Sequence, residues 1–194
     1  MPRAREYNHH ELLTEAVSAF WANGFARTTM GDIVKRTGVN RASLYAAYPD
    51  KRALFLASLQ HYLETVTLKN LHHLERGGKA GESIRGFFFR LISEPAPEGS
   101  SALGCLLTNT AVELGGAEED VAVLVRQAFS RVEEALRRRL TEARTQGDLS
   151  QDVDPEQLAK HLLVLVQGVR VMSRLGVDRR FLKQAVEFAL RPIK

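Results

Sequence analysis

The side chains best suited to recognising another molecule lie close together in one stretch of the chain, residues 41–51. Arg41 and Ser43 can donate hydrogen bonds to base edges or to phosphate oxygens, and the methyl group of Ala42 can contact the methyl group of thymine. Leu44, which follows Ser43, is expected to pack inward. Three further side chains have the length and polarity to reach phosphates: Tyr45, Tyr48 and Lys51. These residue types in this order suit contact with double-stranded DNA.

Such contacts require a helix that enters a DNA groove, and the surrounding sequence predicts one. Thr29 and Asp32 have the spacing of a capping box, which starts a short helix that ends at Gly38. Asn40 is a favourable N-cap for a third short helix. Two short helices separated by a turn that contains glycine form a helix-turn-helix, here residues 29–48. In this motif the N-terminal residues of the second helix lie at the base edges.

The rest of the chain is also helical in pattern. Apolar residues recur every three or four positions in residues 12–21, and Asn23-Gly24 ends that helix because both residue types tolerate a left-handed conformation. Asp50 can cap a long fourth helix that continues toward a loop at residues 77–81. Five further helices are expected at about residues 84–91, 103–114, 118–146, 155–175 and 178–190.

This pattern predicts an all-α fold of about nine helices without strands. Residues 1–52 are expected to form a three-helix head that carries the helix-turn-helix. Residues 53–194 are expected to form a larger helical body.

The composition is that of an ordinary globular protein with a weakly basic balance. The formal net charge is +4 and the isoelectric point is about 9.4, which suits a polyanionic partner. The single cysteine, Cys105, excludes an intramolecular disulfide and a thiolate zinc cluster. We expect no signal peptide and no membrane span, because apolar runs such as Leu162 to Val166 are far too short. These features predict a cytoplasmic protein.

Other groups of reactive side chains do not complete a recognisable site. His9-His10-Glu11 lacks the second ligand histidine of the zinc-protease motif, because position 14 is threonine. His72-His73 are adjacent, so on a helix they diverge by about 100° and are poor co-ligands. The loop Gly77-Gly78-Lys79-Ala80 lacks the first glycine and the Ser/Thr of a phosphate-binding P-loop. We therefore predict no metal site, no cofactor and no enzymatic activity.

Four spaced elements in the first 55 residues together resemble the N-terminal head of the TetR family. They are Phe20-Trp21-x-x-Gly24-Phe25, Thr28-Thr29-Met30-x-Asp32-Ile33, Gly38-Val39-x-x-x-Ser43-Leu44-Tyr45 and Lys51-x-x-Leu54-Phe55. The resemblance implies that DNA is contacted by Thr29, Arg41, Ala42, Ser43, Tyr45, Tyr48 and Lys51. Ala46 and Ala47 stand where many members have an aromatic or histidine pair. One subgroup of the family has the pattern Tyr-Ala-Ala-aromatic, which residues 45–48 of this chain resemble.

The resemblance also implies a helical body that forms a homodimer and binds a small effector. In the family the last two helices form a four-helix interface with the partner subunit. The segment from Leu162 to Val166 is apolar around most of its circumference, which requires burial on more than one side. We therefore expect these residues at the interface: Leu162, Leu165, Val166 and Val169. The same pattern also fits a core helix in a monomer.

Cys105 has two interpretations. It lies in Leu103-Gly104-Cys105-Leu106-Leu107, near the predicted start of a helix, where the helix dipole favours a thiolate. Asn109 lies one turn further along nearly the same face. The segment is similar to one in a TetR subgroup with members that respond to electrophiles through this cysteine, which implies a sensor thiol. The alternative is a small apolar residue that is needed for packing.

Together these features favour a sequence-specific DNA-binding transcription regulator. The family implies a bacterial, nucleoid-associated repressor that a small-molecule effector releases from a palindromic operator. Two alternatives are an architectural DNA-binding protein without an effector and a helical enzyme. The first alternative gives no reason for the large body at residues 53–194, and no catalytic constellation supports the second.

Overall fold

The structure, a computed structural model, describes residues 8–76, 78–93 and 104–194. Across these ranges the secondary structure is helical, apart from one isolated β-bridge between Leu149 and Ile193. The helices are α1 (His9–Arg27), α2 (Met30–Thr37), α3 (Arg41–Ala47), α4 (Lys51–Tyr62), η1 (Leu63–Thr67), α5 (Leu68–Glu75), α6 (Ala80–Ser93), α7 (Leu106–Leu114), α8 (Glu119–Gln146), α9 (Pro155–Arg174) and α10 (Arg179–Ala189).

The predicted fold class is confirmed. α4, η1 and α5 follow one another directly and form one rod, so the described part of the chain contains nine helices. The end of the predicted helix at Leu103 lies outside the described residues. The predicted boundary after residue 52 falls within α4, and the division into two domains stays a prediction.

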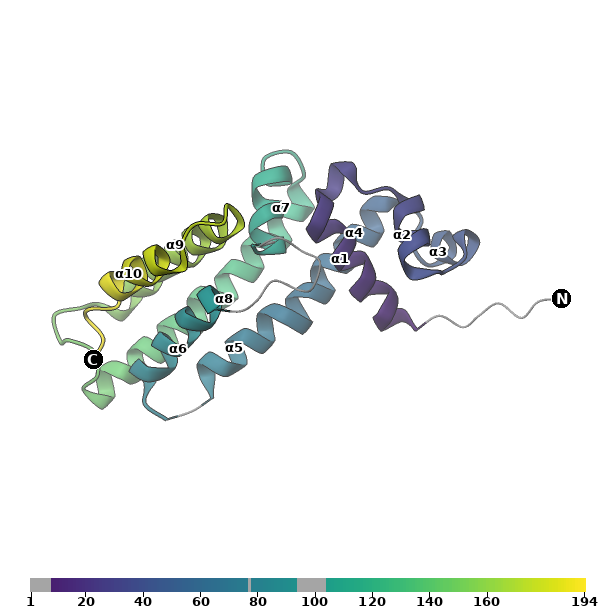
Figure 1. Ribbon diagram of the computed structural model, residues 1–194. Coiled ribbons are helices and arrows are strands. Elements are labelled where there is room, and N and C mark those ends of the chain that lie inside the picture. Colours follow the sequence, from purple (N-terminus) through teal and green to yellow (C-terminus); the bar gives the residue numbers. More distant parts are fainter. Residues whose placement is uncertain (1–7, 77, 94–103) are drawn as a thin grey trace.

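The molecule is elongated, with a small head at one end and a longer helical body at the other (Figure 1). α1, α2 and α3 form the head, and the α4–η1–α5 rod leads from it into the body. α8, the longest helix at 28 residues, packs against α5, α6, α7 and α9. α10 lies against α6 and α9. The helix-turn-helix therefore stands apart from most of the chain.

Local capping fixes the two helices of the helix-turn-helix. The capping box of α2 is complete: Thr29 Oγ1 accepts from the Asp32 amide at 3.1 Å, and the Thr29 amide donates to Asp32 Oδ2 at 2.9 Å. The Thr29 hydroxyl and the Thr29 amide both donate to the Asp32 carboxylate, which lowers the pKa of Asp32. Gly38 ends α2 in the left-handed conformation, and Asn40 caps α3 by accepting from the Ser43 amide at 3.1 Å. The predicted start and end signals are confirmed.

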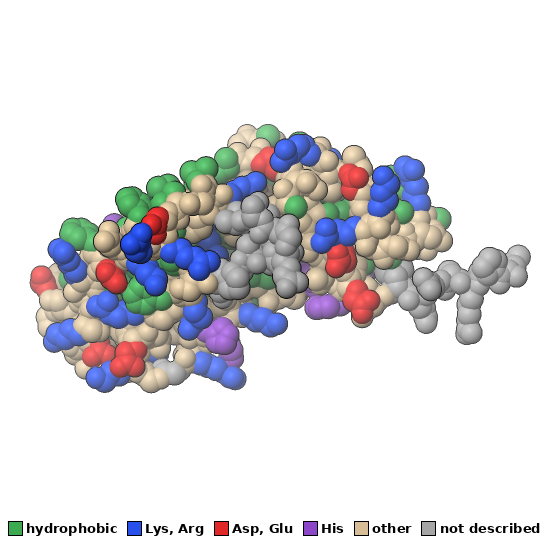
Figure 2. Space-filling model, in the orientation of Figure 1, with side chains coloured by type: hydrophobic (Ala, Val, Ile, Leu, Met, Phe, Trp, Pro, Cys, Tyr) green, Lys and Arg blue, Asp and Glu red, His purple; other side chains and the backbone are tan. Residues whose placement is uncertain are grey.

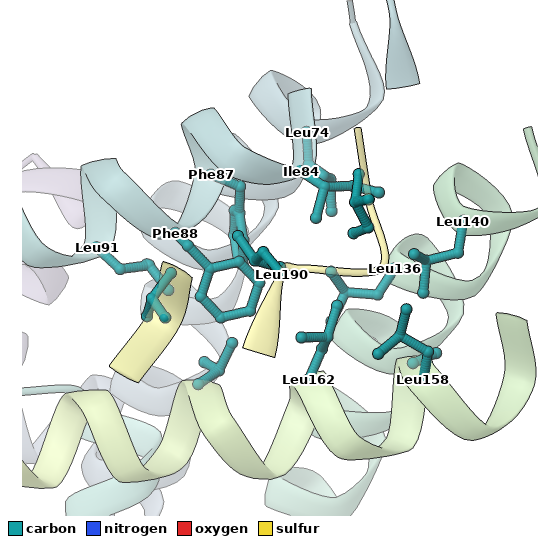
Figure 3. Packing of buried hydrophobic residues seen from close by; sticks show 14 of the residues in the cluster. Leu74, Ile84, Phe87, Phe88, Leu91, Leu136, Leu140, Leu158, Leu162 and Leu190 are labelled. Carbon is teal, nitrogen blue, oxygen red and sulfur yellow. The ribbon is translucent and has the colours of Figure 1, made fainter. Parts of the chain in front are cut away.

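Two hydrophobic cores hold the molecule together. The first joins the head to the body, because its buried residues extend from Leu12 of α1, through Phe55 of α4, to Ala128 of α8. The second fills the body between α5, α6, α8, α9 and α10, where side chains such as Phe88 and Leu136 meet (Figure 3). Because the first core is shared, the head is not a separate packing unit.

One π-helical turn, η1, interrupts the α4–α5 rod. Within it the Thr65 hydroxyl donates to the carbonyl oxygen of His61 at 2.7 Å. Single π turns in α-helices often occur at functional sites. This turn contributes Val66 and Thr67 to the wall of a cavity in the body.

A carboxylate on α7 holds the end of α1. Gly24 interrupts the helical conformation of α1 with φ 79° and ψ 172°. The amides of Phe25 and Ala26, which follow it, donate to the Glu113 carboxylate at 3.0 and 2.8 Å. The Phe25 carbonyl oxygen accepts from Lys51 Nζ of α4 at 2.9 Å. These hydrogen bonds form a joint between the head, α4 and α7.

A second link connects α4 to the beginning of α8. The Arg52 guanidinium pairs with Glu118 at 3.1 Å and with Asp120. Hydrogen bonding to Glu118 raises the pKa of Arg52. All three side chains are about two-fifths exposed, so the pairs orient α4 relative to α8 more than they stabilise the fold.

Gly24→Ala is expected to destabilise the protein more than Gly38→Ala. The conformation of Gly24 is almost exclusive to glycine, and a Cβ there would lie 2.7 Å from Glu113 Oε2. Gly38 also has a positive φ, 66°, but a Cβ there would meet no atom within 4 Å. Gly38→Ala should therefore cost only the conformational penalty, about 1–2 kcal/mol. Urea denaturation measures both losses, and equal losses would contradict the role of the Glu113 contact.

Candidate nucleic-acid interface and effector cavity

The first turns of α3 present an exposed face at the outer side of the head (Figure 1). Arg41 and Ala42 are exposed and Ser43 is half-buried. The guanidinium carbon of Arg41 lies 5.6 Å from the centroid of the exposed Tyr45 ring. Leu44 is fully buried, as predicted. The exposed face combines donors, a methyl group and an aromatic hydroxyl, which are the groups that major-groove contact uses.

The other three predicted contacts are engaged within the head. The exposed Thr29 donates its hydroxyl to Asp32 Oδ2 at 2.7 Å. Tyr48 has a buried ring, and its hydroxyl lies 3.1 Å from His9 Nε2. Lys51 Nζ lies 4.3 Å from the centroid of the Phe25 ring, in addition to its bond with the Phe25 carbonyl.

Tyr48 and Lys51 therefore connect the corner between α3 and α4 to α1. The sequence pattern did not indicate this packing role, because the partner residues lie 39 and 26 positions away. The basic and aromatic character of the two residues is equally typical of phosphate contacts, which is the role that the sequence suggested.

Most of the predicted interface residues are internal. Leu162, Val166 and Val169 are buried in the core of their own chain, and Figure 3 shows Leu162 among the core side chains. Leu165 is partly buried against the same core. Leu162, Val166 and Val169 therefore have little surface left for a partner, and their assignment to a subunit interface stays a prediction. When a helix is apolar around its circumference, the sequence pattern does not show which side is buried by the same chain and which by a partner subunit.

The exposed apolar side chains of this region lie on other faces of the last two helices. Val164 of α9 is 70% exposed and Leu175, directly after α9, is 73% exposed. Phe181 and Phe188 of α10 are more than half exposed. Figure 2 shows apolar side chains gathered along the edge of the molecule over α9 and α10. A continuous apolar patch on a protein surface marks a site of interaction. We call these four residues the outer face.

A cavity of about 40 Å³ lies in the body, and its wall comes from the α4–η1–α5 rod, α6, α7, α8 and α9. Most of the wall is aliphatic or aromatic, with Phe87 and Phe129 among its residues. Thr108 and Gln167 contribute polar groups, and the Thr108 hydroxyl donates to Gln167 Oε1 at 2.7 Å. A mainly apolar cavity with a few polar groups is typical of a small-molecule site.

Cys105 lines this cavity, whereas Asn109 does not. Cys105 is the N-cap of α7 with an extended backbone, φ −125° and ψ 130°, and Tyr62 donates its hydroxyl to Cys105 Sγ at 3.7 Å. Burial raises the pKa of Tyr62, which keeps this hydroxyl protonated. Asn109 instead lines a wider cleft of about 360 Å³ between α1, α7 and α9. Cys105, which precedes the first turn of α7, and Asn109 thus line different cavities, and a shared role for them stays a prediction.

No described helix is long and apolar enough to cross a membrane. Among the residues that the structure describes, no three His, Cys, Asp or Glu side chains are grouped to hold a metal ion. A helix-turn-helix head on a helical body that contains a cavity is typical of a regulatory protein that binds DNA.

Comparisons with known proteins identify the family. Residues 12–58 match the profile of bacterial regulatory proteins of the tetR family, and residues 86–189 match that of the tetracyclin repressor-like C-terminal domain. The second match alone covers more than half of the chain. The chain belongs to the TetR family, and it is a DNA-binding transcription regulator rather than an enzyme.

Individual relatives cover nearly the whole chain. The HTH-type transcriptional repressor ComR of Escherichia coli (strain K12) is 26% identical over 97% of this chain and 90% of its own length. The uncharacterized HTH-type transcriptional regulator YezE of Bacillus subtilis (strain 168) is 28% identical over 98% of both chains. A cysteine mutant of the TetR family regulator CifR, complexed with 26-base-pair double-strand operator DNA, has a TM-score of 0.84 and 25% identity over 97% of this chain and 98% of its own.

Proposed function

We propose that this chain is a homodimeric repressor that binds a palindromic operator through α3 and releases it when a small molecule occupies the body cavity. The observation that carries the proposal is the exposed N-terminal face of α3 on a head that Glu113 joins to the body. A structure of the relative CifR contains operator DNA, and the relative ComR is a transcriptional repressor. Both support operator binding and repression by this chain. The proposed place of action is the nucleoid in the bacterial cytoplasm.

In this proposal the contact residues of α3 and of the neighbouring helix ends divide between bases and phosphates. Arg41 and Ser43 donate to base edges, and Ala42 contacts a thymine methyl group. Phosphate contacts come from Thr29, Tyr45, Tyr48 and Lys51. Lys51 suits this role because its contacts with Phe25 already restrict its side chain in the first turn of α4, so little conformational entropy is lost on binding.

The partner subunit covers the outer face of α9 and α10, with Leu165 at its border. Exposed phenylalanine and leucine side chains favour burial, and isologous pairing of two helices from each subunit forms a closed four-helix interface. The two-fold axis then places two α3 helices in successive major grooves, about 34–36 Å apart, which requires a palindromic operator.

Occupation of the cavity changes the placement of the head. The α4–η1–α5 rod borders the cavity and begins at the helix-turn-helix, while α7 borders it and carries Glu113 in its last turn. A ligand that alters the spacing of these two elements therefore tilts the head. The effect is limited by how much more tightly the ligand binds the DNA-releasing conformation than the DNA-binding conformation. To change the ratio of these conformations from 1:99 to 99:1, the ligand needs about a 10⁴-fold difference in affinity.

Cys105 is proposed as a sensor thiol in the same cavity. It is half-buried at the start of α7, and the Tyr62 hydroxyl contacts its sulfur. Modification of this thiol would add volume in a small cavity and displace α7. Asn109, in the neighbouring cleft, is proposed to contribute to effector response through α7 rather than by contact with the thiol.

Arg41→Ala is expected to relax base preference, whereas Lys51→Ala is expected to weaken binding to every duplex. Duplexes selected from a random pool supply the operator, and fluorescence anisotropy at several salt concentrations measures affinity. Arg41→Ala should cost about 1–3 kcal/mol on the selected site, and Lys51→Ala should flatten the salt slope by about one unit. Arg180→Ala, exposed on α10, is the control. Wild-type affinity and slope in both variants would refute the assignment.

Val164→Arg is expected to give a folded monomer, because it places an unpaired charge in the proposed subunit interface. Val169→Arg places the charge in the core of the chain and should unfold the protein instead. Val123→Arg, at an exposed position on α8, should leave a dimer. Analytical ultracentrifugation and circular dichroism distinguish these outcomes. A Val164→Arg variant that remains dimeric at micromolar concentration would exclude the outer face as the interface.

Cys105→Ser is expected to abolish the response of operator binding to a mild electrophile. N-ethylmaleimide adds to a thiol by forming a carbon–sulfur bond while the proton moves to carbon, so no other reactant is needed. Cys105 is the only cysteine, which makes the reaction specific. Anisotropy should show operator release for the wild type alone. Equal release by both proteins, or by neither, would assign Cys105 to packing.

A further inference from the structure

One charged side chain lies in the wall of the body cavity. Arg170 of α9 is half-buried there, and it is the only Asp, Glu, Lys, Arg or His among the described residues that line the cavity. In the described ranges its guanidinium has neither an ion pair nor a hydrogen bond. This contrasts with Arg137 and Arg138 on α8, which pair with Glu134 at the surface.

Neutral polar groups surround this cation. Gln167 precedes Arg170 by three positions on α9, so both side chains lie on one side of the helix. The Thr108 hydroxyl donates to Gln167 Oε1 at 2.7 Å and fixes that amide. The positive charge of Arg170 reaches Tyr62, where it opposes the rise in pKa that burial causes. Arg170, Gln167 and Tyr62 therefore converge on the same space.

Apart from Thr67, Asn70 and Cys105, the rest of the wall is apolar, and this limits the chemistry of the occupant. Phe87, Leu91 and Val132 offer no polar side-chain atoms to a ligand. A cationic ligand would be repelled by Arg170, and no described carboxylate lines the cavity to attract it. A neutral apolar ligand would displace water from the guanidinium without replacing its hydrogen bonds, which is unfavourable. An anion with an apolar portion satisfies both parts of the wall.

We propose that the effector is a short-chain carboxylate whose anionic group binds Arg170 and whose hydrocarbon portion contacts the apolar wall. Guanidinium and carboxylate groups form paired, charge-assisted hydrogen bonds. The cavity volume of about 40 Å³ is well below the roughly 300–1,000 Å³ of typical ligand pockets, which favours a ligand of few atoms. The inference rests on the proposed role of the cavity as the effector site.

Three probes of similar shape and different charge test the inference on the full chain. They are butyrate, butyramide and n-butylammonium, with acetate and benzoate as shorter and bulkier carboxylates. Isothermal titration calorimetry and thermal unfolding measure binding without DNA. We expect butyrate to bind at least about tenfold more tightly than butyramide, since loss of the charge removes paired hydrogen bonds. We expect no binding of butylammonium.

Arg170→Gln is expected to weaken butyrate binding by about tenfold or more while leaving butyramide binding unchanged. The matched control is Arg174→Gln, one turn further along α9, where the arginine is exposed and outside the wall of this cavity. Arg170→Lys keeps the charge without the paired geometry and should bind with intermediate affinity. It also serves as the second variant if Arg170→Gln does not fold by circular dichroism.

The outcomes separate this inference from the proposed function. Failure of all three carboxylates to bind, equal binding of butyrate and butyramide, or unchanged butyrate binding by Arg170→Gln would overturn the inference. In each of these cases anisotropy of the ligand-free protein on selected duplexes still tests operator binding. Conversely, butyrate that binds through Arg170 without changing operator affinity would support the anion site and contradict its role as the effector site.

Discussion

The arrangement of the molecule depends on the hydrogen bonds between Glu113 and the two amides that follow Gly24. Those amides lie at the end of α1, where the departure from helical geometry leaves them without acceptors in the helix. A carboxylate is well suited to accept from both, because charge-assisted hydrogen bonds are stronger than neutral ones. The bonds attach the head to α7, and α7 begins at the body cavity. One side chain thus relates the position of the recognition helix to the shape of the cavity.

α4 and α7 contact the head through side chains of opposite charge. Lys51 of α4 approaches the carbonyl oxygen of Phe25, while Glu113 of α7 accepts from the amide of the same residue. The peptide groups around Phe25 are therefore held from both sides. If α4 moved relative to α7, either the hydrogen bonds of Lys51 or those of Glu113 would stretch, or the head would move with one of the helices. Strong hydrogen bonds favour movement of the head. Through this joint a displacement of α4 or α7 in the body would be transmitted to the head.

The sequence allowed prediction of those features that depend on neighbouring residues. Helix starts at Thr29, Asn40 and Asp50 and the end at Gly38 were correct, because a cap is formed within a few positions. Interactions between distant positions could not be predicted. Glu113 lies 88 positions from Phe25, and the cavity wall draws on residues from 62 to 170. The apolar pattern of α9 indicated burial on several sides, but the inward orientation of Leu162 depends on which helices surround it.

The shared core also affects the order in which the protein can fold during synthesis. The head is made first, yet its core includes side chains from α7 and the first part of α8, as far as Ala128. Bacterial ribosomes add roughly 5–20 residues per second, so the interval between completion of α4 and of Ala128 lasts on the order of several seconds. During that interval Leu54, Phe55 and Leu59 lack part of their native neighbours and are open to chaperones. A nascent chain can therefore complete the core beneath its recognition helix only after more than half of it has been synthesised.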